Sequence, residues 1–404
     1  MRKQEKYLKN DIGLSYFSRL FNLIKKKIRL FIIKKINKEK YLKYLVYDKA
    51  LNKVSRIQRL YYSKELDIIT KQLKYNRKTI PQIYYLIDDN ILKLKCYFNN
   101  RVIKNDYERL VEEITLMTGL VLIEKELING ICFLELGALN DEKIEPIFLK
   151  DITKEDTEHS IILGDSFGKK IIWDYSKNPH LIISGATGSG KTTMVNYVLS
   201  SLLMFSDVWC IDGKGVDYLH SSYHFEKYTD VSNPEDALDL LEQFYEIMLE
   251  RKALMQSAIK NGNNVKNVYE LGLKPIFLLI DENTSVVESL PSKAPKGEVA
   301  LRSIYLNKLG QIARLGRAFG TLLILVMQRP DAKIIEGETR NNFTCRVVLG
   351  SPEEESYRMV FGNNNANLAP LSIGKGYVQL NSKVSYFKVP YLKDIISDKV
   401  KEVD

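Results

Sequence analysis

The segment Gly185–Thr192, Gly-Ala-Thr-Gly-Ser-Gly-Lys-Thr, constrains the fold of this 404-residue chain more than any other segment. It has the pattern G-x-x-x-x-G-K-[ST], and it lies between a short apolar run at 180–184 and a run at 193–203 with apolar residues at helical spacing. In the order strand, glycine loop, helix, this pattern binds phosphate. The glycines let backbone N–H groups surround the phosphate, and the helix N-terminus adds positive potential.

The loop and the first turn of the helix are therefore predicted to bind the nucleotide. In chain order the residues are Gly185, Ala186, Thr187, Gly188, Ser189, Gly190, Lys191, Thr192 and Thr193. Lys191 is expected to reach the β- and γ-phosphates, and the Thr192 hydroxyl is expected to hold Mg²⁺.

An acidic motif follows about 90 residues later, where an apolar run at 276–280 ends in Asp281 and Glu282. Asp281 is predicted to position Mg²⁺, and Glu282 to act as general base toward the attacking water. Adjacent acids are typical of additional-strand P-loop ATPases, and the sequence lacks the Asn-Lys-x-Asp motif of GTPases. ATP and Mg²⁺ are the predicted cofactors.

Gln328 directly follows another apolar run, 321–327. A polar side chain at the tip of the strand beside the acid-bearing strand can sense the γ-phosphate, so Gln328 is a candidate catalytic residue. The alternative is a glutamine that simply faces solvent.

Apolar strands and helices alternate from about residue 151, which predicts an α/β fold with a mostly parallel sheet and helices on both faces. Residues 151–404 are the expected RecA-like motor domain. Residues 46–150, with alternating strands and one amphipathic helix, are expected to form a small α+β accessory domain.

Residues 1–45 carry 14 Lys/Arg against 3 Asp/Glu, whereas the whole chain has a net charge of +10, so the rest is near neutral. Apolar residues recur at spacings of three and four between Leu14 and Phe31, which predicts a basic amphipathic helix. This helix could lie on an anionic membrane surface, meet nucleic-acid phosphates, or pack on its own protein.

Four scattered cysteines, no secretory signal and no apolar run long enough to span a bilayer indicate a cytoplasmic protein, or one held peripherally at the inner face of the membrane. Trp173 and Trp209 are expected in the core.

The motifs occur in one order that resembles the FtsK/SpoIIIE family of DNA-pumping ATPases. The order is 185–192, then Ile-Asp-Gly-Lys-Gly at 211–215, Leu-Leu-Ile-Asp-Glu at 278–282 and Ala-Arg-Leu-Gly-Arg-Ala-Phe-Gly to Gln-Arg-Pro across 313–330. Segments at 341–346 and 374–376 are similar to later parts of the family. In size and layout the chain is similar to TcpA-type coupling ATPases of conjugative elements.

The resemblance implies a homo-hexameric ring around DNA, held without sequence preference, that hydrolyses ATP at subunit interfaces. It also implies a catalytic arginine from the neighbouring subunit, carried over to Arg251, with Arg314 and Arg317 as alternates. Relaxase or channel proteins are implied partners. Lys214, in the Gly-Lys-Gly turn, is expected to face either the nucleotide or the pore.

The chain also departs from the family. Asp281-Glu-Asn-Thr-Ser285 replaces the usual Asp-Glu-Phe-Ala-Asp, which leaves contacts beyond Glu282 open. Roughly 28 residues follow Gly376, too few for the C-terminal winged-helix module with which chromosome-segregating members read DNA sequence, so sequence-directed loading is not expected. Two rival functions are an EssC-like ATPase that drives protein secretion and a P-loop scaffold that barely hydrolyses ATP.

Overall fold

The computed structural model divides the chain into two compact units, Met1–Glu142 with Asn367–Ala369, and Lys143–Ala366 with Pro370–Asp404. The structure describes residues 8–9, 82–88, 91–97, 111, 114–115, 118, 120–129, 131–137, 146–147, 159–218, 223–329, 331, 334–350, 354–362, 371–380 and 383–392. The helix predicted between Leu14 and Phe31 lies outside these residues.

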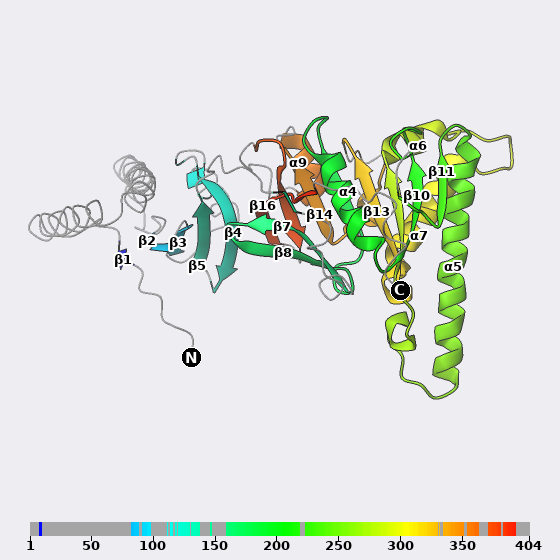
Figure 1. Cartoon of the computed structure of the whole chain (residues 1–404), viewed down its shortest axis with the longest axis horizontal. Coiled ribbons are helices and arrows are strands. Elements are labelled where there is room, and N and C mark those ends of the chain that lie inside the picture. The colour runs from blue at the N-terminus through cyan, green and yellow to red at the C-terminus, as the bar shows by residue number, and fades with distance from the viewer. Residues whose placement is uncertain are drawn as a thin grey trace, which may run out of the picture. The chain divides into compact units, whose positions relative to one another are not determined.

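The larger unit is built on a ten-stranded sheet with the order β11-β10-β12-β13-β9-β14-β15-β16-β7-β8 (Figure 1). The first six strands in that order are mutually parallel. They are β11 (Lys227–Asp230), β10 (Asp207–Asp212), β12 (Ile276–Asp281), β13 (Thr321–Met327), β9 (Leu181–Gly185) and β14 (Cys345–Leu349). Their carboxyl ends therefore meet at one edge, which is where α/β proteins bind ligands.

Helices cover both faces of this sheet, because the strands at its centre are apolar along their whole length. Leu181 and Ile183 of β9 pack with α4 (Lys191–Leu202), whereas Ile182 belongs to a second core with α5 (Pro234–Lys260) and α7 (Leu301–Phe319). All residues of β12 and β13 are buried. The predicted α/β architecture is confirmed, and Trp173 and Trp209 are core residues as expected.

The four remaining strands depart from the predicted alternation of strands and helices, because they pair antiparallel. They are β7 (Ser160–Ser166), β8 (Lys169–Asp174), β15 (Lys375–Leu380) and β16 (Lys383–Lys388). Phe167 and Gly168 join β7 to β8 with positive φ values of 51° and 83°. A two-residue connection of this kind permits only a hairpin, since a parallel crossover needs a dozen or more residues.

The smaller unit contains an antiparallel sheet with the order β1-β2-β3-β5-β4. Its strands are β1 (Leu8–Lys9), β2 (Gln82–Asp88), β3 (Ile91–Tyr97), β4 (Val121–Ile128) and β5 (Ile131–Gly137). Alternate residues of β3 and β5 are buried, so one face carries the core of this unit.

Short elements complete the described residues: β6 (Pro146–Ile147), η3 (Val268–Leu271), α6 (Asn283–Ser289), α8 (Gly337–Asn341), α9 (Glu354–Phe361) and β17 (Tyr391–Leu392). Within the part of the chain that the structure describes, no helix combines the length and the apolar character needed to cross a membrane.

Candidate nucleotide-binding site

The predicted phosphate loop lies between β9 and α4, at the carboxyl edge of the parallel strands. Gly188 and Gly190 have φ values of 77° and 103°, a left-handed backbone that glycine adopts without strain. Gly190 is the N-cap of α4 and has no side chain to cap the helix. The first N–H groups of a helix have no partner within it, so this end of α4 can bind an anion.

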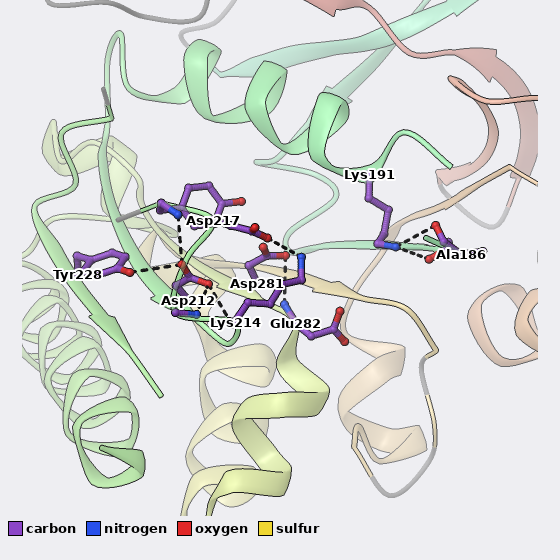
Figure 2. Close-up of polar contacts among 11 residues, drawn as sticks. Ala186, Lys191, Asp212, Lys214, Asp217, Tyr228, Asp281 and Glu282 are labelled. Atoms are coloured by element: carbon purple, nitrogen blue, oxygen red, sulfur yellow. Dashed lines mark hydrogen bonds and ion pairs between the residues drawn. The ribbon is translucent and has the colours of Figure 1, made fainter. Parts of the chain in front are cut away.

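Lys191 extends from the first turn of α4 back over the loop. Its Nζ donates hydrogen bonds to the carbonyl oxygens of Gly185 and Ala186, the latter at 3.1 Å (Figure 2). Burial lowers the pKa of Lys191, and the nearby Glu282 carboxylate opposes this shift. The ammonium therefore lies close enough to the acidic motif to feel its charge.

Asp281 and Glu282 lie on the same edge of the sheet, at the end of β12. Both are buried, at 5% and 7% exposure. Asp281 Oδ1 accepts a hydrogen bond from the Glu282 backbone N–H at 3.1 Å. In Figure 2 the side chains of Lys191, Asp281 and Glu282 face one space. The structure thus brings together the two motifs that the sequence placed about 90 residues apart.

Glu282 is held in an unusual backbone conformation, with φ 51° and ψ 57°. A non-glycine residue in the left-handed region costs of order 1 kcal/mol, and such residues cluster at active sites. The next residue, Asn283, is fully buried and accepts a hydrogen bond from the Tyr305 hydroxyl at 3.0 Å. The sequence left open what the residues beyond Glu282 contact. The hydrogen bond between Asn283 and Tyr305 shows that the first of them connects α6 to α7.

The donor set at this edge fits Mg²⁺. Burial raises the pKa of Asp281 to about 6, an effect that the ammonium of Lys214 opposes, and a bound cation would stabilise the same carboxylate. No group of three or more His, Cys, Asp or Glu side chains among the described residues is arranged to hold a metal. One carboxylate and one hydroxyl, from Asp281 and Thr192, suit Mg²⁺ because it takes its remaining ligands from water and substrate phosphates.

The turn after β10 is a part of the site to which sequence analysis assigned no clear role. Asp212 at the end of β10 is fully buried and pairs in register with Asp281. Its carboxylate accepts hydrogen bonds from the backbone N–H groups of Lys214, Gly215 and Tyr218, and from the Tyr228 hydroxyl. Asp212 therefore holds the Gly-Lys-Gly turn in place beside Asp281.

A cleft of about 690 Å³ opens beside Glu282, and the phosphate loop is not part of its lining. Gln328 is exposed at the end of β13, and its backbone carbonyl accepts a hydrogen bond from the Ser184 hydroxyl at 3.2 Å. Glu282, Lys214 and Gln328 line the same cleft. Gln328 thus has access to any group held beside Glu282.

Arg251 lies at the opposite edge of the sheet. Its guanidinium donates to the carbonyl oxygens of Phe319 and Gly320 at 3.0 and 3.1 Å, just before β13 begins. The structure therefore does not bring Arg251 to the phosphate loop of the same subunit. Arg314 and Arg317 are exposed on α7. The trans role predicted for one of these arginines stays a prediction.

The segment before β15 supports the phosphate loop from the other side. The Gly374 N–H donates to the Ser189 carbonyl at 3.1 Å, and a Cβ on Gly190 would lie 3.3 Å from the Gly374 nitrogen. The family-like motif at 374–376 had no assigned function, and this contact gives it one. It fixes the loop against β14 and β15.

Residues 150–304 match the model of the FtsK/SpoIIIE family. The chain carries an FtsK/SpoIIIE-family domain. The match covers the phosphate loop, the Gly-Lys-Gly turn and the acid pair, so the domain is an ATPase domain.

Two relatives extend the likeness beyond that domain. The FtsK domain-containing protein YdcQ of Bacillus subtilis is 28% identical over 376 residues, which cover 92% of this chain and 72% of YdcQ. The DNA translocase FtsK of Caldanaerobacter subterraneus is 27% identical over 251 residues, covering 58% of this chain. This chain spans only 33% of that FtsK.

Solved structures share the fold. The pCW3 conjugation coupling protein TcpA, in a monomer form with ATPγS, superposes with a TM-score of 0.54 at 22% identity, over 78% of this chain and 90% of TcpA. ATPases 2 and 3 of EssC from Geobacillus thermodenitrificans give a TM-score of 0.50 at 15% identity, over 65% of this chain and 50% of that two-ATPase chain. At these identities both show the fold alone.

Proposed function

We propose that the FtsK/SpoIIIE-type ATPase of this chain is a DNA translocase that moves plasmid or mobile-element DNA during conjugation. The observation that carries this proposal is the convergence of the phosphate loop, Asp281, Glu282 and Gln328 on one sheet edge. The cargo is inferred from relatives, because FtsK is named a DNA translocase and TcpA a conjugation coupling protein.

In this proposal each group has a role. Lys191 and the N-terminus of α4 bind the β- and γ-phosphates of ATP, and Thr192 and Asp281 would hold Mg²⁺, which supplies charge neutralisation when bound. Glu282 accepts a proton from the attacking water. The water oxygen bonds to the γ-phosphorus as the bond from that phosphorus to the bridging oxygen of ADP breaks, giving ADP and phosphate. Gln328 orients the water or the γ-phosphate.

The proposal includes a hexameric ring that encircles DNA without sequence preference. In such a ring a neighbouring subunit supplies an arginine to the transition-state charge. Arg251 would first have to leave its two carbonyl partners, whereas Arg314 and Arg317 are exposed on α7. Relaxase or channel proteins are the proposed partners at the membrane.

Steady-state ATP hydrolysis with and without DNA tests the proposal. Wild-type turnover should rise with DNA of any sequence, and Lys191→Ala and Glu282→Gln should each lose about 10³-fold or more in turnover. Lys177→Ala is a matched control, because Lys177 pairs with Asp174 at 2.6 Å and does not line the cleft.

The alternative function, in which the motor moves protein, predicts a different result. An EssC-like motor that moves protein should hydrolyse ATP at the same rate whether or not single- or double-stranded DNA is present. Turnover indifferent to every form of DNA would therefore overturn the DNA-translocase proposal and leave the ATPase intact. Turnover that is negligible under all conditions would favour a scaffold.

The basic segment 1–45 is proposed as the membrane contact. Its deletion should reduce flotation with anionic liposomes and leave DNA-independent ATP hydrolysis within about twofold of wild type, since the site residues lie elsewhere. Equal flotation of the full chain and the truncated chain would refute the membrane role.

A further inference from the structure

The Gly-Lys-Gly turn after β10 is fixed more tightly than a surface turn requires. The Gly213 N–H donates to the Asp281 carbonyl at 2.8 Å, and a Cβ on Gly213 would lie 2.5 Å from that oxygen and 2.6 Å from the Glu282 carbonyl oxygen. Only glycine fits so close to the acid pair. Together with the buried Asp212 carboxylate, this contact ties the position of the Lys214 backbone to the end of β12.

The Lys214 side chain extends from this turn toward the acid pair (Figure 2). It lines the 690 Å³ cleft with Glu282 and Gln328, and in Figure 2 its ammonium end lies beside Asp281. Its ammonium pairs with the carboxylate of Asp217, three residues further along the same turn. Partial burial lowers the pKa of Lys214, but the hydrogen bond to Asp217 and then the charges of Asp281 and Glu282 outweigh it, so the pKa lies above its usual value.

The ion pair between Lys214 and Asp217 is poorly suited to a purely structural role. The two side chains are 39% and 29% exposed, so solvent screens their attraction. Exposed pairs of this kind contribute little to stability, and a charge-assisted bond to a phosphate is stronger. The lysine can therefore exchange Asp217 for an anionic ligand at little cost.

We propose that Lys214 is a second catalytic cation supplied by the same subunit, which leaves Asp217 and contacts the γ-phosphate of ATP opposite Lys191. The assignment rests on the ATP site described above. The sequence left open whether Lys214 faces the nucleotide or the pore. This assignment selects the nucleotide, because the ammonium faces Asp281 and Glu282. Lys191 comes from the helix after β9 and Lys214 from the turn after β10, so the two cations approach from different sides.

Affinity for two fluorescent nucleotides tests this role. A γ-phosphate contact should make Lys214→Met bind mant-ATPγS about tenfold more weakly, with the affinity for mant-ADP within about twofold of wild type. The turnover number should fall by about 10²-fold at saturating ATP, and Lys214→Arg should restore part of both losses. Asp217→Asn, which removes only the competing carboxylate, should bind mant-ATPγS as well as wild type or better.

The control is Lys177→Met, which breaks the i,i+3 pair with Asp174 outside the cleft and should change neither affinity. Equal losses for mant-ATPγS and mant-ADP in Lys214→Met would overturn the proposal in favour of a positioning role. Unchanged nucleotide affinity with loss of DNA stimulation would overturn it in favour of a DNA contact. Wild-type protein that binds neither nucleotide would instead refute the ATP site, whatever Lys214 does.

Discussion

The polar side chains at the two ends of the parallel strands in the larger unit differ in what they do. At the carboxyl edge, Lys191, Lys214, Asp281 and Glu282 face one space, and Glu282 has a strained backbone. At the amino edge the polar groups serve the fold. Arg251, as noted above, donates to two backbone carbonyls there.

His180 is a second example from the amino edge. It is fully buried just before β9, and its Nδ1 accepts a hydrogen bond from the Leu323 N–H at 2.9 Å. Both edges bury ionisable side chains, and at the carboxyl edge Lys214 and Glu282, of opposite charge, line one cleft. Burial of an ionisable residue therefore does not identify a site by itself, whereas convergence of charges does.

Asp281→Asn should have the largest effect, and it should act on activity and stability in opposite directions. Loss of the carboxylate should lower hydrolysis about 10²–10³-fold, because an amide is a weak Mg²⁺ ligand. The folded-state pKa of Asp281, about 6, is above its ordinary value of 3.8. The folded state therefore binds the proton more tightly, and stability is lost as pH rises from about 4 to about 6.

The amide removes that cost, so the nucleotide-free variant should be more stable than wild type at pH 8 by about 1–3 kcal/mol. The gain should shrink toward zero near pH 4. Urea unfolding at both pH values measures it. A variant that is less stable than wild type at pH 8 would show that the Asp281 carboxylate is a structural group, like those of the amino edge.

Arg251→Ala should have a smaller effect, on stability. Two charged hydrogen bonds to backbone carbonyls are lost, which should cost about 2 kcal/mol in the free energy of unfolding. The turnover number per folded molecule then shows whether Arg251 also has a catalytic role in the neighbouring subunit. A rate within about threefold of wild type would make Arg251 a structural group, and a fall of 10³-fold or more would assign it as the trans arginine. Arg346→Ala is the control, because it also removes guanidinium hydrogen bonds to backbone carbonyls, those of Phe343, Val360 and Arg340, and Arg346 is not a candidate trans arginine.

The fold of the larger unit could be predicted where each element carries its own local signal. The strands 276–281 and 321–327 are buried on both faces, and 345–349 is buried except at Arg346, so their runs of apolar residues marked them in the sequence. The hairpins β7-β8 and β15-β16 were not predicted. The pairing of these four strands depends on contacts between segments far apart in the sequence. The alternation of strands and helices along the chain does not indicate those contacts.

The sequence likewise predicted some parts of the candidate site and missed others. The phosphate loop and acid pair are contiguous motifs, so sequence could locate them. Asp212 was missed because its role depends on a turn that folds back on its carboxylate. A strand-end acid followed by Gly-x-Gly was the available signal. The orientation of Lys214 depends on tertiary packing against β12, which the sequence does not encode locally.

The smallest expected effect is a pH dependence that separates the two edges. The ionised fraction of Asp281 should be one half at pH 6 and about a tenth at pH 5, so kcat/KM for hydrolysis should fall about twofold and then tenfold below its plateau. Burial lowers the pKa of His180 to about 3, so this residue stays neutral throughout that range. His180→Asn, whose side-chain oxygen can still accept from Leu323, should therefore keep the same acid limb. A kcat/KM that is flat from pH 8 to pH 5 in wild type would refute the assignment of Asp281 as the group that must be ionised.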